Sequence, residues 1–484
     1  MGWKRALLIN PPTGLYIRED RCQAPLQGMA ATAARPPLDL MYMAATMEQV
    51  GVECRIKDYP VHGGSWTDFK NELASFKPDA LFISVTSFTI HDDLIACEKA
   101  KEVLGDAITT VAKGAHVAVK AVETLKAAPA LDVAVQGEYE LIAKEMATTD
   151  DLRTVAGISF RDRKTGEIVS TETRPYLTEL DILPYPARHL VDNTVYQRPD
   201  TGEMQATIQT SRGCPAACIY CLAPTVYGSK IRVRTPKNVV GELKECVEKY
   251  GIRDFFFRAD TFTWNKKWVM DLCAAINEEK LEIRWVCNSR VDTIDAERLI
   301  AMKKAGCHGI AFGIESGVQD MLNKMKKGTT VEKNAAAVKL CKEHGMKTLL
   351  YMIMGLPWDN EESIKQSVDF AVALGGDFVE FHTAIPFPGT ELYDIAQRDK
   401  LYDNENLNGF DYTRSPLKTY SLSSKQLMEL RRKAFMRVYL NPGSAFRIAR
   451  TIIKGARTPA QLWRTLTFGT QKMASLILAR DEGR

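Results

Sequence analysis

The chain has 484 residues, of which 45% are hydrophobic, and this length predicts two or three domains with well-filled cores. Its 64 basic and 60 acidic residues leave a net charge of +4, which gives no support for a nucleic-acid partner. No apolar run approaches the roughly 18 residues of a membrane span, and the apolar stretch near the N-terminus is too short for a signal peptide, so we expect a cytoplasmic protein with reduced thiols.

Short β-rich segments alternate with amphipathic segments over residues 1–150. The predicted strands are 6–10, 54–58, 80–85, 107–112 and 133–136, and the predicted helices are 38–50, 66–76, 92–103, 117–126 and 140–146. This alternation is typical of a flavodoxin-like, doubly wound parallel sheet, which binds ligands beyond the carboxyl ends of its strands. Ser87, Gly114 and Gly137 lie in loops at those ends, where small residues would let a bulky planar group approach the backbone.

Residues 151–200 predict a hairpin followed by a linker. The segments 155–160 and 168–171 flank a polar turn sequence that ends in Gly166, which is a hairpin signal. Pro184 and Pro186 then interrupt regular structure. We therefore expect this region to connect two domains.

Three cysteines follow with the spacing C-x3-C-x2-C, at Cys214, Cys218 and Cys221. Thiolates at this spacing can converge on one metal centre. A [4Fe–4S] cluster held by three cysteines leaves one iron open, whereas a structural zinc site normally has four protein ligands. No His or further Cys follows until Cys246, so a local zinc site is poorly supported. The remaining alternative is three unrelated thiols.

With Tyr220 directly before the last cysteine, this stretch resembles the signature of the radical S-adenosylmethionine (radical SAM) enzymes. The resemblance implies that the open iron binds the amino and carboxylate groups of SAM. It also implies that one electron, supplied by a donor such as flavodoxin or ferredoxin, cleaves SAM into a 5′-deoxyadenosyl radical that abstracts hydrogen. The protein would then supply position and a dry cavity.

The β and α patterns alternate six times over residues 201–395. The predicted strands are 206–210, 254–257, 283–287, 309–313, 347–352 and 378–383, and the predicted helices are 236–250, 266–279, 296–305, 331–344, 361–374 and 390–397. Six such units predict a partial, TIM-like (β/α)6 barrel, with its chemistry at the carboxyl ends of the strands. The cysteine triplet follows the first strand, at that end.

Residues at the other strand ends are candidate SAM contacts by the same resemblance. With Tyr220, the candidate set is Asp260, Arg290, Gly313, Glu315, Ser316 and Gly355. Many radical SAM enzymes carry Gly-Gly-Glu after the second strand, so Asp260 departs from the family pattern there. Local alternatives stay open: Asp260 could cap the next helix, Arg290 could pair with Asp292 or Asp295, and Glu315 could form a local ion pair.

The segments 36–45, 113–116 and 136–138 resemble those of cobalamin-binding domains fused ahead of radical SAM barrels. The resemblance implies a cobalamin pocket that contains Ser87, Gly114, His116, Gly137 and Glu138. A familiar cobalamin motif, D-x-H-x-x-G, places a cobalt-binding His after the first strand, but residues 10–37 contain no His. We therefore expect cobalamin without a His ligand; His62 as the ligand, or an unliganded or nucleotide-binding domain, are the alternatives.

Strand patterns stop in residues 396–484, and helices are predicted at 423–440, 445–453 and 460–478. Acidic residues are nearly absent from 430 to 480, whereas arginines and lysines are frequent. Two interpretations remain open. These helices could lie on an anionic membrane surface, which would favour a lipid-like substrate, or they could pack on the barrel with their basic side chains in solvent.

The order of segments resembles the cobalamin-dependent radical SAM enzymes, the class B methyltransferases among them, over nearly the whole chain. We therefore expect an α/β protein with an N-terminal cobalamin-binding domain, a radical SAM barrel and a helical C-terminal region. The implied function is methylation of an unactivated carbon in an apolar or lipid-like small molecule, through methylcobalamin and the deoxyadenosyl radical. Radical cyclisation or carbon–carbon coupling is one alternative, and a non-catalytic cobalamin and iron–sulfur sensor is another. The sequence assigns no general acid or base.

Overall fold

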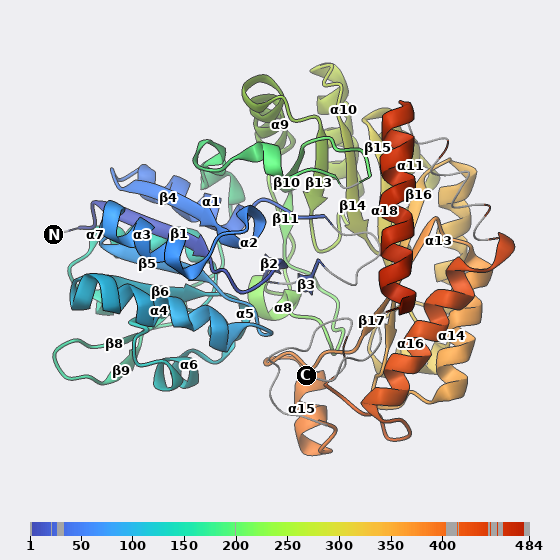
Figure 1. Ribbon diagram of the computed structural model, residues 1–484. Coiled ribbons are helices and arrows are strands. Elements are labelled where there is room, and N and C mark those ends of the chain that lie inside the picture. The colour runs from blue at the N-terminus through green and yellow to red at the C-terminus, as the bar shows by residue number, and fades with distance from the viewer. Residues whose placement is uncertain are drawn as a thin grey trace.

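The computed structural model describes residues 2–20, 22–26, 33–198, 200–402, 414, 416–443, 446, 453 and 458–478. Two parallel sheets organise these residues, an N-terminal sheet and a six-stranded barrel sheet. Figure 1 shows the N-terminal sheet on the left and the barrel on the right. The α/β fold class predicted from the sequence is confirmed.

The N-terminal sheet has seven strands in the order β4-β1-β5-β6-β7-β8-β9. They are β4 (Glu53–Asp58), β1 (Arg5–Asn10), β5 (Ala80–Ser84), β6 (Thr109–Lys113), β7 (Val133–Val135), β8 (Ile158–Arg161) and β9 (Ile168–Ser170). The first five are parallel to one another. β1 and β5 are apolar and buried on both faces, as the central strands of a doubly wound sheet must be.

Helices cover both faces of this sheet. They are α1 (Leu38–Glu48), α2 (Tyr59–His62), α3 (Trp66–Phe76), α4 (Ile90–Leu104), α5 (Ala115–Val119), α6 (Ala121–Ala127) and α7 (Tyr139–Thr148). Alternate residues of β1 separate the two cores: Ala6 and Leu8 pack with α1 and α7, whereas Leu7 and Ile9 pack with α3, α4 and α6. This two-sided burial explains why the strands read as continuous apolar runs.

Three details of the N-terminal half differ from the prediction. The predicted hairpin forms as β8 and β9, but β8 pairs with β7, so the hairpin extends the N-terminal sheet instead of standing apart in a linker. The helix predicted at 117–126 is divided into α5 and α6 because Lys120 leaves helical geometry. A hairpin that was not predicted, β2 (Tyr16–Glu19) and β3 (Cys22–Pro25), forms between β1 and α1.

The barrel sheet has the parallel order β10-β13-β14-β15-β16-β17. Its strands are β10 (Gln205–Gln209), β13 (Asp254–Arg258), β14 (Arg284–Ser289), β15 (Cys307–Glu315), β16 (Lys347–Met354) and β17 (Phe378–Thr383). Within the described strands, β10 and β17 are the two edges and do not pair with each other, so the barrel is open between them. Phe257 stacks on Trp285 with ring centroids 4.5 Å apart in its core.

The helices that follow the barrel strands are α9 (Pro236–Tyr250), α10 (Lys266–Glu278), α11 (Ala296–Lys304), α13 (Val331–Glu343), α14 (Glu361–Leu374) and α15 (Glu391–Arg398). Each begins after a residue whose side chain accepts a hydrogen bond from a first-turn N–H. These caps are Thr235, Asn265, Asp295, Thr330, Asn360 and Thr390. Such caps stabilise a helix by about 1 kcal/mol each and fix where the preceding loop ends.

The carboxyl edges of the two sheets meet in a buried joint. Arg258, the last residue of β13, donates to Asp39 at the start of α1 over 2.8 Å, and Lys113 at the end of β6 donates to the same carboxylate over 2.7 Å. All three side chains are buried. Figure 1 shows the hairpin of β2 and β3 between the two halves, where its Glu19 also pairs with Arg258.

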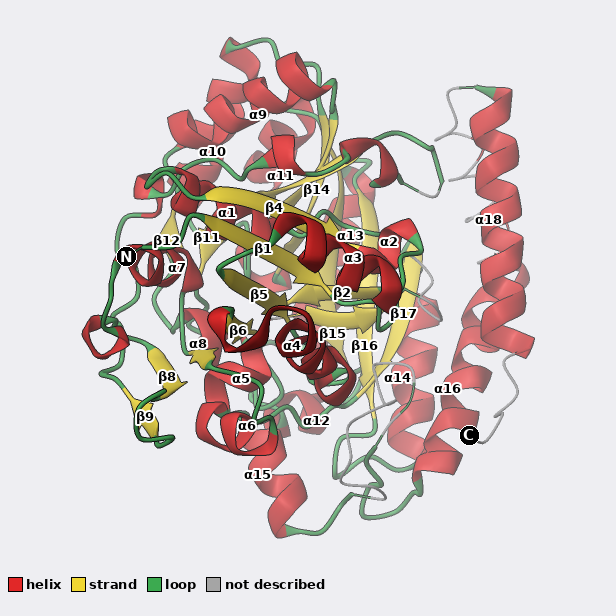
Figure 2. Cartoon of the chain, turned by 60° about the vertical axis from the view of Figure 1, so that its left-hand side comes forward, coloured by secondary structure: helices red, strands yellow, loops and turns green. Residues whose placement is uncertain are grey.

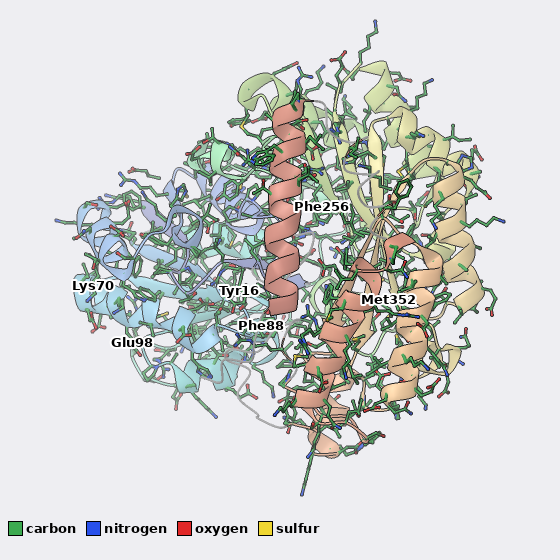
Figure 3. All side chains as sticks on the ribbon, turned by 45° about the vertical axis from the view of Figure 1, so that its right-hand side comes forward. Tyr16, Lys70, Phe88, Glu98, Phe256 and Met352 are labelled. Atoms are coloured by element: carbon green, nitrogen blue, oxygen red, sulfur yellow. The ribbon has the colours of Figure 1, made fainter. Side chains whose placement is uncertain are left out.

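An apolar contact completes the joint. Phe88, from the loop after β5, lies 5.5 Å from Phe387, from the loop after β17, measured between ring centroids. Tyr16 of β2 packs against the same cluster. Figure 3 shows Tyr16 and Phe88 close together where the two halves meet, far from Lys70 and Glu98 on the outer helices. Apolar and ionic contacts therefore both hold the two edges against each other.

The C-terminal region supplies α16 (Ser424–Tyr439) and α18 (Pro459–Leu478), which correspond to two of the three predicted helices. α16 packs on α14 and β17, and α18 packs on α16. Figure 2 shows α18 beside α16 at the right-hand side of the molecule. Most of the predicted helix at 445–453 lies outside the described residues. Within the described helices, none is long and apolar enough to cross a membrane.

Replacing Arg258 by Met leaves the buried Asp39 and Glu19 without their cation from the barrel. We expect Arg258→Met to lower the free energy of unfolding by about 3–5 kcal/mol, because one member of a buried ion pair is removed. Urea unfolding monitored by circular dichroism measures the change. Lys267→Met, which breaks an exposed pair with Asp271, is the control and should leave the midpoint unchanged. Equal midpoints for the two variants would contradict the assigned role of the joint.

Candidate active site

The cysteine triplet lies on the loop after β10, between that strand and the short helix α8 (Ala223–Tyr227). Two tight contacts fix this loop. Ser211 and Arg212 form β11, which pairs with Arg232 and Val233 of β12. Gly213 has a φ of +91°, and a Cβ there would lie 2.2 Å from the carbonyl oxygen of Lys230, so only glycine fits.

The three thiols on this loop are the predicted cluster ligands. None is in a disulfide; Cys214 is buried, and Cys218 and Cys221 are partly exposed. Burial raises the pKa of the Cys221 thiol to about 12, and interactions with Cys218, Asp260 and Cys214 raise it further. Within the described residues no three His, Cys, Asp or Glu side chains converge on a single ion. A [4Fe–4S] cluster does not require that, because each thiolate binds its own iron.

Asp260 and Arg290, both predicted SAM contacts, have protein partners. The Asp260 carboxylate accepts a hydrogen bond from the Gly213 N–H over 2.9 Å, which ties the second strand end to the cysteine loop. It does not cap α10, because Asn265 does. Arg290 pairs with Asp292 over 2.8 Å, the local alternative weighed above, and donates to the Lys327 carbonyl over 2.9 Å.

Glu315 forms an ion pair within a buried network at the end of β15. It accepts from Lys327 over 2.7 Å and from the Tyr220 hydroxyl over 3.0 Å. Its φ of +65° is rare for a residue with a side chain, and such strain is typical of functional sites. At Gly313 a Cβ would lie 2.1 Å from the Glu315 Oε1 atom, so this glycine leaves room for the carboxylate.

Ser316 and Gly355 complete the predicted SAM contacts. The Ser316 hydroxyl is 2.9 Å from the hydroxyl of Ser367 and accepts the Val318 N–H, so it anchors α14 and the start of α12 (Gln319–Lys324). The N–H of Gly355 donates to the buried Asp359 carboxylate over 3.0 Å. Both residues thus have structural roles in shaping the strand ends.

The inner face of β16 is apolar and partly exposed. Leu350, Met352 and Met354 are buried against the outer helices, and Figure 3 marks Met352. The alternate residues Leu349, Tyr351 and Ile353 are half-buried on the opposite face, as strand periodicity requires. Tyr351 lies 5.2 Å from His382 of β17 between ring centroids. The barrel therefore presents an apolar lining with an aromatic pair.

Three of the five predicted cobalamin-pocket residues could contact a ligand at the carboxyl edge of the N-terminal sheet. Two have polar atoms without a partner in the part of the chain that the structure describes, and the third is a glycine beside open space. Among the described residues, the buried Ser87 Oγ and His116 Nδ1 atoms have no hydrogen-bond partner. Gly137 has a φ of +109° and no heavy atom within 4 Å of where a Cβ would lie. These residues follow β5, β6 and β7, which are neighbours in the sheet. These two polar atoms and the space beside Gly137 are what this edge offers to a ligand.

Gly114 and Glu138 have other roles. A Cβ at Gly114 would lie 2.4 Å from the Val85 carbonyl oxygen, so the glycine is required by the packing of two loops. Glu138 is buried and pairs with Arg212 over 3.0 Å and with Arg232 over 2.8 Å. Two arginines of the barrel half thus hold the Glu138 carboxylate, and its contact with cobalamin stays a prediction.

A small cavity of about 30 Å³ lies where β1 and β5 diverge, lined by Asn10, Ser84, Asp39 and Arg18 among others. In doubly wound sheets this switch point is where ligands bind. β2 covers it, because Arg18 donates to the Ser84 carbonyl over 2.9 Å and pairs with the buried Asp93. His62 is exposed on α2, beyond the edge strand β4.

Sequence reasoning missed the buried cations of this region. Arg258, Lys113, Arg212 and Lys327 all hold carboxylates. Arg258 and Lys113 are the last residues of buried strands. A charge in that position needs a partner of opposite charge, so the sequence could have predicted an ion pair there. Lys327 gave no signal of its own, since it lies in a polar loop far from any strand.

The family comparison agrees with this geometry. The model of the radical SAM superfamily matches residues 208–371, which include the cysteine triplet and most of the barrel. A relative from Pyrococcus horikoshii, called an uncharacterized methyltransferase, is 30% identical over 442 residues, which are 90% of this chain and 93% of the relative. The chain belongs to the radical SAM enzymes. The predicted radical SAM family and its enzymatic nature are thereby confirmed, and this family uses a [4Fe–4S] cluster and SAM.

Other relatives of this radical SAM enzyme have different activities. A cytidylyl-2-hydroxyethylphosphonate methyltransferase from Streptomyces wedmorensis is 28% identical and covers 83% of each chain. An anaerobic magnesium-protoporphyrin IX monomethyl ester cyclase from Rubrivivax gelatinosus is 25% identical over 84% of this chain and 74% of its own. The named reactions thus differ among relatives of this chain.

Solved structures share the whole fold. TsrM from Kitasatospora setae, a radical SAM methyltransferase solved with cobalamin and a [4Fe–4S] cluster, matches with a TM-score of 0.69 and 16% identity over 98% of this chain and 99% of its own. The cobalamin-dependent enzyme OxsB matches with a TM-score of 0.70 and 16% identity over 98% and 72%. The two-sheet arrangement is therefore that of known enzymes.

Asp359 makes the stability of this enzyme depend on pH. Burial raises its pKa from 3.8 to about 6, so the folded state holds this proton more tightly than the unfolded state. The contribution of Asp359 to stability therefore falls as pH rises from about 4 to about 6. An Asn residue does not titrate. We expect the free energy of unfolding of Asp359→Asn, relative to wild type, to rise by about 2–3 kcal/mol between about pH 4 and pH 7.

Denaturant unfolding at several pH values measures this difference. The control is Asp320→Asn, which makes the same replacement at an exposed side chain. A difference for Asp359→Asn that stays constant over the same range would contradict the prediction.

Proposed function

We propose that this enzyme transfers a methyl group to an unactivated carbon of an apolar small molecule, in a reaction that uses cobalamin and a 5′-deoxyadenosyl radical. One observation carries the proposal. Arg212, two residues before Cys214, pairs with Glu138 over 3.0 Å and also with Glu140. Glu138 directly follows Gly137, which lies at the carboxyl edge of the N-terminal sheet. The cysteine loop and the proposed cobalamin edge are thus joined by buried ion pairs, as a reaction shared by the two cofactors requires.

When bound, the cluster and SAM supply the deoxyadenosyl radical, and cobalamin supplies the methyl group. The residues of this chain hold and orient these groups. Cys214, Cys218 and Cys221 are the proposed cluster ligands. Glu315, held by Lys327 and Tyr220, would accept hydrogen bonds from SAM.

Residues at the carboxyl edge of the N-terminal sheet support the cobalamin part of the proposal. Ser87 Oγ and His116 Nδ1 would bond the polar side groups of the ligand, and Gly137 would face its flat surface. Burial lowers the pKa of His116 to about 4, so its imidazole is neutral near neutral pH and either donates or accepts. The exposed position of His62 favours the expectation of cobalamin bound without a His ligand.

The inner face of the barrel supports an apolar substrate. Leu349, Tyr351 and Ile353 lie on the inner face of β16 and are half-buried, so they can pack on a hydrocarbon group. The buried joint excludes water from the adjoining strand ends, which protects a reactive radical from side reactions.

Radical cyclisation is the second candidate, favoured by the cyclase from Rubrivivax gelatinosus that matches 84% of this chain. The mass of the product separates the two reactions. Methylation adds a methyl group from SAM, whereas cyclisation removes hydrogen and adds no carbon. The third alternative, a non-catalytic sensor, is disfavoured by membership of an enzyme family and by the three-cysteine motif.

The deciding experiment is anaerobic. The protein is reconstituted with iron, sulfide and hydroxocobalamin and then given a reductant and SAM with a deuterated methyl group. We expect 5′-deoxyadenosine and S-adenosylhomocysteine to form together, and the labelled methyl group to enter a component of an added bacterial lipid extract. Deoxyadenosine without S-adenosylhomocysteine, in protein that retains cobalamin, would overturn the methylation proposal.

Single replacements of the cluster ligands test the iron site. We expect Cys214→Ala, Cys218→Ala and Cys221→Ala each to lower the iron content and to reduce deoxyadenosine formation at least about 100-fold, because an incomplete ligand set does not hold the cluster. Cys54→Ala is the control, since Cys54 is buried in the N-terminal sheet. Iron analysis and electron paramagnetic resonance make the measurement. Full iron content in any ligand variant would contradict its assignment.

Gly137→Ala tests the cobalamin edge, because its Cβ would project into the open space that the proposed ligand fills. We expect cobalamin retention after gel filtration to fall by about tenfold while the iron content is unchanged. Gly166→Ala is a matched control, because Gly166 also has a positive φ, of +75°, and open space around its Cβ position, but lies in the turn between β8 and β9. Equal cobalamin retention in the two variants would contradict the assignment of Gly137 to the cobalamin site.

A further inference from the structure

The apolar lining of the barrel contains a polar aromatic pair, Tyr351 of β16 and His382 of β17. Their ring centroids lie 5.2 Å apart. Phe381, the residue before His382, packs outward, with its ring centroid 5.4 Å from that of Phe435 on α16. Successive residues of a strand point to opposite faces, so His382 points inward. Both side chains of the pair are half-buried, and each therefore keeps surface that a ligand can contact.

Strand register places this pair beside the predicted SAM contacts. Tyr351 is the register partner of Gly313 on β15 and of Glu380 on β17. His382 is the partner of Ile353, one layer nearer the carboxyl ends of the strands. Neighbouring strands lie about 4.8 Å apart, so a group held by this pair is roughly 5–10 Å from β15. A small molecule can therefore reach from the pair to the SAM site.

The imidazole of His382 is neutral near neutral pH. Burial lowers its pKa to about 3, and the positive charge of Arg431 contributes to this shift. Arg431 belongs to α16 and donates to the Phe381 carbonyl over 2.7 Å. A neutral imidazole donates one hydrogen bond and accepts one, and a tyrosine hydroxyl does both. The pair can therefore hydrogen-bond a neutral group, but it carries no charge to offset an anionic one.

The surroundings of the pair also disfavour an anionic group. Glu380 lies on the same inner face of β17 and is buried. It precedes His382 by two residues, which is about 6.6 Å along a strand. A carboxylate at this distance repels a carboxylate or a phosphate. An ammonium group would be costly beside the apolar residues of β16, because burying a charge costs more than burying a neutral oxygen.

We propose that Tyr351 and His382 bind a neutral oxygen of the substrate, a hydroxyl or a keto group, and thereby determine which carbon meets the SAM site. The oxygen accepts hydrogen bonds from the Tyr351 hydroxyl and the His382 N–H. Leu349 and Ile353, which flank Tyr351 on the inner face, contact the adjoining hydrocarbon. This role rests on the proposed function, because it narrows the substrate class of the same site.

Chemical blocking of the added lipid extract tests the substrate class. The reconstituted enzyme receives SAM with a deuterated methyl group and the extract in one of three forms: untreated, acetylated with acetic anhydride, or treated with methoxyamine. Acetylation blocks hydroxyl groups, and methoxyamine blocks keto groups. We expect labelled product from the untreated extract and at least about tenfold less from one blocked extract. The acetylated extract loses the label if the oxygen is a hydroxyl, and the methoxyamine extract loses it if the oxygen is a keto group.

An extract acetylated with an N-hydroxysuccinimide ester is the matched control, because this reagent blocks amines and leaves hydroxyl groups free. We expect it to be labelled as strongly as the untreated extract. Loss of label in this control would assign the pair to an amine and overturn the proposal. Equal labelling of all the extracts would overturn it as well.

Two replacements that keep a ring test the residues themselves. Tyr351→Phe removes only the hydroxyl, and His382→Phe removes the N–H. With the precursor of the labelled product, purified from the extract, we expect each to raise KM about tenfold. We also expect more deoxyadenosine per methylated product, because the reacting carbon is no longer held in place. Tyr420→Phe and His189→Phe are the controls, since both side chains are exposed, and they should change neither quantity.

Melting temperatures equal to that of the wild type show that the variants keep the fold. An unchanged KM and an unchanged product ratio in both ring variants would overturn the assignment of the pair. The comparison of extracts uses the wild-type enzyme alone, so it decides the substrate class even where a variant unfolds.

Failure of this site and failure of the proposed function are distinguishable. Label that enters every extract equally would refute the oxygen site alone and leave methylation in place. Deoxyadenosine without label in any extract would refute the proposed methylation, and this role of the pair with it.

Discussion

Buried ion pairs between two sheet edges are the interaction on which the rest of this enzyme depends. Arg258 and Lys113 meet on Asp39, and Arg212 meets Glu138 and Glu140. A buried charge is costly unless it is paired, so each arginine fixes the distance between the barrel and the N-terminal sheet. Because Arg212 lies two residues from Cys214, the position of the cysteine loop follows from the same contacts.

The contacts around Glu315 explain why its strained backbone conformation persists. Glu315 adopts a φ of +65° where β15 shifts its register against β16, and Lys327 and Tyr220 hold its carboxylate. A strained residue persists only where its surroundings determine its conformation. Here Gly313 provides the space and Arg290 holds the Lys327 carbonyl, so residues predicted to bind SAM also build the support for one another.

The shared fold does not determine which reaction an enzyme of this kind performs. Structures with 16% identity share both sheets, yet the named relatives include methyltransferases and a cyclase. The reaction therefore depends on side chains that line the barrel and on the groups at the N-terminal edge. The half-buried apolar side chains of β16 are the feature that supports the proposed apolar substrate.

The sequence alone determined most of the helices and strands and predicted the cluster ligands, because hydrophobic period, helix caps and cysteine spacing are local properties. The partners of the charges were decided by the tertiary structure. Arg258 and Asp39 are 219 residues apart, so no local pattern relates them. The pairs of Glu138 with Arg212 and Arg232 likewise join residues 74 and 94 positions apart. The hairpin of β8 and β9 joined the N-terminal sheet for the same reason: strand pairing depends on which edge is free in three dimensions.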